Sequence, residues 1–193
     1  MTVWDAPPFA AFAEAAPLAI GVSEEIELVG PHLRVKGTIA IGMFHRLSDR
    51  VNHSRGYILV RDARLMRRNG DPTDLMLEEL MINQDEITFI GQRSAGGTGA
   101  GVAEGYGTAP DRETRRYVFF TPGHTISADV QVFGESGLAS FAEATDPRFV
   151  PLTHARARSL ADRRVISHYE FLLLNRTQLT AVAEASRAAS FAD

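Results

Sequence analysis

The sequence predicts an all-β protein, a tandem pair of small barrels of about five short antiparallel strands each. Three observations support this fold class. Apolar and polar residues alternate in short runs. This two-residue period is typical of a half-buried strand. The same order of runs occurs twice at a nearly constant offset, as in an internal duplication of a roughly 65-residue unit. A glycine-rich stretch, residues 91–107, separates the two copies and is typical of a flexible connection.

The first copy begins with an apolar run at residues 26–29, which ends just before Pro31. Residues 33–41 alternate strictly, so one face of this strand is expected in the core and the other in solvent. Residues 57–60 are apolar on both faces, as a central strand would be. Two more strands are expected at 76–82 and 87–90, and the polar residues between them form a turn.

The second copy repeats this order. Residues 117–120 precede Pro122, residues 126–132 alternate, and the later strands and turn follow in register. Identical residues recur at one offset: Ala63/Ala155, Arg64/Arg156, Glu78/Glu170, Leu80/Leu172, Asn83/Asn175 and Thr88/Thr180. Their shared order and offset predict a duplication rather than chance similarity.

Short helical segments are expected to interrupt each copy, at residues 47–51 and 138–142, because apolar residues recur there at i and i+3 or i+4. Alanine-rich residues 9–15 and 183–192 also favour helix, and they could cap the barrels or dock on another protein. The predicted organisation is an apolar N-terminal segment 1–23, a first repeat 24–91, a linker 92–114, a second repeat 115–184 and a tail 185–193.

The composition narrows the class of protein. The chain has 193 residues, of which 45% are hydrophobic, so a packed core is expected. The absence of cysteine excludes disulfides and a thiol nucleophile and fits a cytoplasmic location. The net charge of −4 gives no general reason to bind nucleic acid. No apolar run is long enough to span a membrane and no signal peptide is apparent, although peripheral contact with a membrane complex stays open.

Two stretches carry a family resemblance. The hairpin at residues 80–90 resembles the second motif of Sm-like proteins, and residues 57–63 resemble the end of their first motif. The run Arg46-Leu-Ser-Asp-Arg-Val-Asn52, with 57–63 and 82–87, is similar to an uncharacterised bacterial domain with the pattern RLSDxLN…FLxLxDA…VNxxxI. The resemblance implies two Sm-like or SH3-like barrels, which we expect to pack about a pseudo-two-fold axis.

The resemblance also marks two turns. RNA-binding Sm proteins carry an Arg-Gly pair in their last turn, and the equivalent positions here are Asn83–Gln84 and Asn175–Arg176. Neither turn contains glycine and the first is uncharged, so they do not reproduce that pocket and Sm-type RNA binding is not favoured.

Arginine is enriched at equivalent places in the two copies. Of the 20 basic residues only Lys36 is lysine, which reflects either a GC-rich genome or a need for bidentate contacts. The candidate anionic-partner residues are Arg61, Arg64, Arg67, Arg68, Arg156, Arg158, Arg163 and Arg164. They could bind phosphates, an acidic protein or lipid headgroups, or they could be solvated hairpin charges.

No catalytic pattern is evident. The chain lacks GxSxG, HxH and HExxH spacings, and the adjacent carboxylates Glu78–Glu79 are expected on opposite faces of a strand. We therefore expect no catalytic residue, no cofactor and no metal. The sequence favours a non-enzymatic interaction or scaffold module that binds a protein partner or itself. The alternatives are RNA binding through the arginine clusters and small-molecule binding in the cleft between the repeats.

Overall fold

The structure is a computed structural model that describes residues 22–67, 75–92, 112–133, 137–162 and 165–185. The predicted N-terminal helix, most of the glycine-rich linker and the C-terminal tail lie outside the described residues. So do Arg68, Arg163 and Arg164 of the candidate clusters.

Among its described residues, the first half of the chain forms five strands and one short helix. Alternating apolar residues give it antiparallel hairpins, and the apolar pair Leu47 and Val51 buries one side of the helix. The elements are β1 (Ser23–Val29), β2 (Leu33–Ala40), α1 (Leu47–His53), β3 (Tyr57–Arg67), β4 (Leu75–Asn83), the 3₁₀ turn η2 (Gln84–Glu86) and β5 (Phe89–Gln92).

The second half repeats this order of elements. The helix α3 is buried through Phe141, whose ring lies 5.9 Å from that of Tyr117. The elements are β6 (Arg112–Phe120), β7 (His124–Phe133), α3 (Leu138–Glu143), β8 (Phe149–Ser159), β9 (Ile166–Asn175), the 3₁₀ turn η3 (Arg176–Gln178) and β10 (Ala181–Glu184). Both predicted helical interruptions are present.

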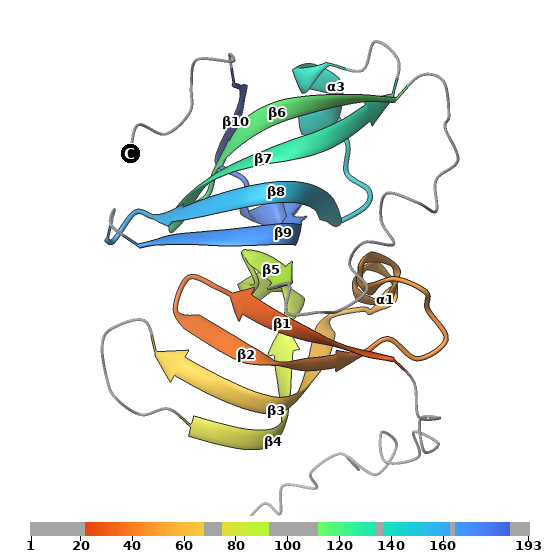
Figure 1. The fold of residues 1–193 in the computed structure, drawn as a ribbon, viewed down its shortest axis with the longest axis vertical. Coiled ribbons are helices and arrows are strands. Elements are labelled where there is room, and N and C mark those ends of the chain that lie inside the picture. The colour runs from red at the N-terminus through yellow and green to blue at the C-terminus, as the bar shows by residue number, and fades with distance from the viewer. Residues whose placement is uncertain (1–21, 68–74, 93–111, 134–136, 163–164, 186–193) are drawn as a thin grey trace, which may run out of the picture.

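All ten strands belong to one antiparallel sheet, in the order β10-β6-β7-β8-β9-β5-β1-β2-β3-β4. The all-β prediction is therefore confirmed at the level of fold class. The strands do not form two separate closed barrels, because β5 of the first half pairs with β9 of the second and joins both halves into one sheet. Figure 1 shows the two halves stacked, with β5 and β9 where they meet.

The two halves meet head to tail. The joint pairs β5, the fifth strand of the first half, with β9, the fourth strand of the second. A two-fold axis that exchanged the two halves would also pair β10 with β4, but β10 and β4 lie at opposite ends of the sheet, so the predicted pseudo-two-fold relation is wrong. The sequence could not show this, because either edge of each unit is available for pairing.

Matching irregularities occur in both halves. Asp62 and His154, which are 92 positions apart, have positive φ angles of 50° and 48°. The ladder register shifts beside them, between Lys36 and Thr38 and between Ser127 and Asp129. Each register shift is a β-bulge, which bends the long strand locally and increases its twist.

The core consists of two clusters that exchange side chains across the joint. The cluster of the first half includes Phe149, Phe171 and Leu173 from the second half. The cluster of the second half includes Val29 and Phe89 from the first. Neither half has a core made only of its own residues.

The C-terminal prediction needs one correction. Ala183 and Glu184, expected to lean toward helix, belong to strand β10, which pairs with Val118 and Tyr117 of β6. Ladder hydrogen bonds to β6 override a local alanine preference for helix. Among the described residues, no helix is long and apolar enough to cross a membrane.

Candidate functional site: the strand-edge interface

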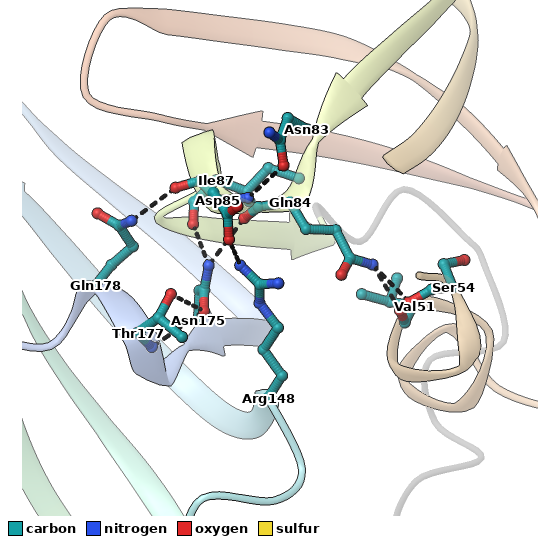
Figure 2. A network of polar contacts seen from close by, with 10 residues as sticks. All are labelled: Val51, Ser54, Asn83, Gln84, Asp85, Ile87, Arg148, Asn175, Thr177 and Gln178. Atoms are coloured by element: carbon teal, nitrogen blue, oxygen red, sulfur yellow. Dashed lines mark hydrogen bonds and ion pairs between the residues drawn. The ribbon is translucent and has the colours of Figure 1, made fainter. Parts of the chain in front are cut away.

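Asn175 lies at the centre of the joint between the halves. Its side chain is fully buried, and its Nδ2 donates to the carbonyl oxygens of Gln84 (3.0 Å) and Ile87 (2.8 Å). Its Oδ1 accepts from the backbone N and the hydroxyl of Thr177, at 3.1 and 2.9 Å. One amide therefore holds the turn of its own half and the turn of the other half together (Figure 2).

Gln84 connects the same turn to helix α1. Its Nε2 donates to the carbonyl oxygens of Val51 and Ser54, both at 3.1 Å, and the side chain is buried. Asn83 is the counterpart of Asn175. Within the described residues, its side chain makes one hydrogen bond, in which Asn83 Oδ1 accepts from Asp85 N at 3.0 Å. The first turn is thus fixed from both sides (Figure 2), while the side chain of Asn83 is half-buried at the sheet edge.

Several polar contacts at the rim of the joint support it. Asn52 on α1 donates to the carbonyl of Phe149 at 2.9 Å and accepts from its backbone N at 2.8 Å. Arg148 forms an ion pair with Asp85, and Gln178 donates to the Asp85 carbonyl at 2.7 Å. These contacts fix the start of β8 against the first half.

On the other side of the joint, the buried carboxylate of Glu27 connects the two halves. Glu27 is 1% exposed, and its carboxylate accepts from Arg34 Nε at 2.6 Å and from the Tyr169 hydroxyl at 2.7 Å. Burial opposes ionisation of Glu27, but these hydrogen bonds outweigh it and hold its pKa below the usual value. Burial and the neighbouring carboxylate raise the pKa of Tyr169 above its usual value. Glu27 is therefore an anion in a satisfied network.

The outer face of the second half is buried by the first half. Phe149, Phe171 and Leu173 are 0%, 6% and 0% exposed, and all three lie in the core cluster of the first half. They lie on the opposite face of the sheet from Leu172 and Leu174, which fill the core of their own half. The joint therefore combines a strand ladder with a buried apolar face.

The counterparts of these three residues are exposed. Tyr57 is 54% and Met81 63% exposed, whereas Phe149 and Leu173, 92 positions later, are buried. The counterpart of Phe171 is Glu79, also exposed. Leu75 and Met76 extend the exposed apolar surface along β4. We call the exposed side of Tyr57, Glu79, Met81 and Asn83, with the outer backbone of β4, the β4 edge surface.

The sequence did not single out this surface. The Tyr57 and Met81 positions read as ordinary strand residues, and only burial in the folded chain separates them from Phe149 and Leu173. A comparison of the two halves at the 92-residue offset could have pointed to this surface. The more polar residue of a matched pair, Glu79 compared with Phe171, lies at the exposed edge.

The arginine clusters are not brought together. Arg61 and Arg64 lie on β3, and Arg156 and Arg158 lie on β8, with the strands β9, β5, β1 and β2 between them in the sheet. Arg61 forms an exposed ion pair with Glu79 at 3.3 Å. Arg67 ends β3. A single phosphate-binding face formed by both clusters is therefore not supported by the topology.

Arg176, the arginine of the turn η3, contacts residues of its own half. The Arg176 guanidinium lies 4.4 Å from the Phe141 ring centroid and donates to the carbonyl oxygens of Pro147 (3.1 Å) and Ala144 (3.0 Å). Burial lowers its pKa, although it remains a cation. All four turn residues marked by the resemblance therefore contact protein groups.

A cleft of about 360 Å³ lies between the halves, beside the Glu27 network. It is lined from both sides, by residues that include Leu33, Arg34, His124, Ser167 and Tyr169. The Arg34 and Tyr169 polar groups already bind Glu27, so fewer groups are left to recognise a ligand. Among the described residues, no three histidine, aspartate or glutamate side chains are grouped to hold a metal ion.

Comparison with known proteins adds no further assignment, because no family model, curated protein or solved structure matches this chain. The function has to be argued from the interface itself.

Proposed function

We propose that this protein is a non-enzymatic interaction and assembly module, built from a duplicated Sm-like or SH3-like unit, that binds a protein partner along the β4 edge surface. The observation that carries the proposal is the contrast between Tyr57 and Met81, which are exposed, and Phe149 and Leu173, which are buried against a neighbouring unit. The matched bulges and turns of the two halves support the duplication.

The chemistry of the β4 edge surface suits protein recognition. The backbone of an edge strand offers a row of donors and acceptors that another strand can pair with. Exposed Leu75, Met76 and Met81 add apolar contact, and flexible methionines adapt to a partner. Soluble proteins usually protect such edges, so an open one with an apolar face is typical of an interface.

A photo-crosslinking residue tests the proposal. The crosslinker p-benzoylphenylalanine is placed at Met81 and, as a matched control, at Met43, which is 88% exposed but outside β4. In cells of the native host, we expect a protein adduct from position 81 and none from position 43. The absence of an adduct at 81, or equal adducts at both positions, would overturn the proposal.

A further inference from the structure

Among the described strands, the two that have no neighbour on one side are the counterparts of two strands that already pair inside the molecule. β4 ends the sheet on one side and β10 ends it on the other. β4 corresponds to β9, and β10 corresponds to β5, by the same offset of 92 positions that relates Asn83 to Asn175. β5 and β9 form the joint between the halves.

We propose that a second copy of this chain adds its β10 to β4 in the register of the internal joint, so that chains assemble head to tail. The proposal rests on the proposed function and names the partner. The internal ladder pairs Phe89 with Leu174 and Gln92 with Phe171. Shifting both strands by the repeat offset pairs Ala181 with Ile82 and Glu184 with Glu79 of the next chain.

Both sides of this proposed contact carry apolar side chains. Tyr57 and Met81 would enter the second copy as Phe149 and Leu173 enter the first half. The receiving side chains are Leu138, Leu179 and Val182, which are only partly buried on the core of the second half. Their counterparts in the first half, Leu47, Ile87 and Ile90, are buried in the core that the joint completes.

A polar anchor is also available. In the internal joint, Asn175 Nδ2 binds the carbonyls of Gln84 and Ile87. In the second copy, Asn83 Nδ2 would bind the carbonyls of Arg176 and Leu179, the equivalent positions of η3 and its end. Within the described residues, Asn83 makes neither bond in a single chain.

The contact between chains is weaker than the internal joint. Glu79 would face Glu184, where the internal ladder has Phe171 and Gln92. Like charges directly opposite each other disfavour strand pairing. Arg61, 3.3 Å from Glu79, and Arg115, whose charge interacts with Glu184, reduce this repulsion. Since β4 and β10 are different strands, the contact repeats in one direction, and the assembly is a ring or a filament.

Two single-cysteine chains test the register, because the protein has no cysteine of its own. Glu79→Cys and Glu184→Cys chains, both altered at exposed residues, are mixed and mildly oxidised. We expect a heterodimeric disulfide, since facing strand residues lie within disulfide reach. Glu78→Cys is the one-residue register control and Met43→Cys the off-edge control, and each should yield far less heterodimer with Glu184→Cys.

Light scattering supplies the second readout. We expect the unaltered chain to have a mass above the 21.1 kDa of one copy, and Met81→Lys to weaken association roughly tenfold or more, because its ammonium would be buried. Met43→Lys should leave association unchanged. A 21.1 kDa species at about 100 µM, a concentration at which a contact with a Kd well below about 100 µM would associate, would overturn the proposal.

The outcomes separate the two proposals. A monomer whose Met81 photo-adduct is a different protein overturns the second-copy contact and leaves the interaction module standing. An adduct with residues 1–21 of the same chain shows that the chain covers its own edge, and both proposals then fall. Equal heterodimer yield from Glu78→Cys and Glu79→Cys would overturn the proposed register.

Discussion

At the scale of single residues, Asn175 and Asn83 lie at matching turn positions of the two halves but in different environments. We expect Asn175→Ala to lower the free energy of unfolding by about 2–3 kcal/mol, because the buried carbonyls of Gln84 and Ile87 lose their donor. Asn83→Ala should cost at most about 1 kcal/mol in a monomeric sample, since it loses only the bond from Asp85 N. Urea unfolding measures both, and equal losses would contradict the assignment of Asn175 to the joint.

Glu27 gives a pH-dependent prediction at the same scale. Its folded pKa lies below the ordinary carboxyl value of 4.5, so its ionised form stabilises the fold above that pH. This stability is lost as the pH falls through the folded pKa. We expect Glu27→Gln to be less stable than the unaltered chain at pH 7, by about 1–3 kcal/mol, because Arg34 loses its charged partner.

The difference between the two proteins should shrink as the pH falls below 4.5 through the folded pKa of Glu27, because Glu27 then becomes protonated in the unaltered chain, while the other carboxylates titrate in both proteins and cancel. Urea midpoints measured from pH 7 down into this acid range check the trend. A difference that does not change with pH would show that the Glu27 charge contributes no stability.

At the scale of elements, strand β5 holds the halves together and tolerates little added volume. A Cβ on Gly91 would overlap the ring of Tyr169, which is buried and bound to Glu27. We expect Gly91→Ala to destabilise the protein by about 1–3 kcal/mol through this overpacking. Gly137→Ala is the matched control, because no atom lies within 4 Å of its added Cβ. Thermal unfolding followed by circular dichroism compares the two.

At the scale of the whole molecule, the shared cores make the two halves one folding unit. Leu173 belongs to the second half and is fully buried in the core of the first. We expect Leu173→Ala to cost about 2–5 kcal/mol and to expose both halves together. Hydrogen exchange at the amide of Val35 reports on the first half, and exchange at the amide of Ile126 reports on the second. Faster exchange in one half alone would show that the halves unfold separately.

The strands can be predicted from the amino-acid sequence alone, because the signals for them are local. The alternation of Leu33, Val35 and Ile39 predicts β2, the apolar pairs predict α1 and α3, and the polar residues 83–86 predict a turn. Each signal depends on neighbours a few positions away, where backbone geometry limits the choices. The turn residues Asn83 and Asn175 were also marked from sequence, but only as positions equivalent to a turn of the Sm motif.

The roles of Asn83 and Asn175 depend instead on contacts between the two halves. Asn175 binds the other half because β9 pairs with β5. The paired residues lie 79 to 85 positions apart in the chain, and edge pairing of this kind leaves no local pattern. The same pairing buries Phe149 and Leu173, leaves Tyr57 and Met81 exposed, and sets the arginine clusters apart. Burial depends on which strand edges meet, and that choice is made between whole units after each strand has formed.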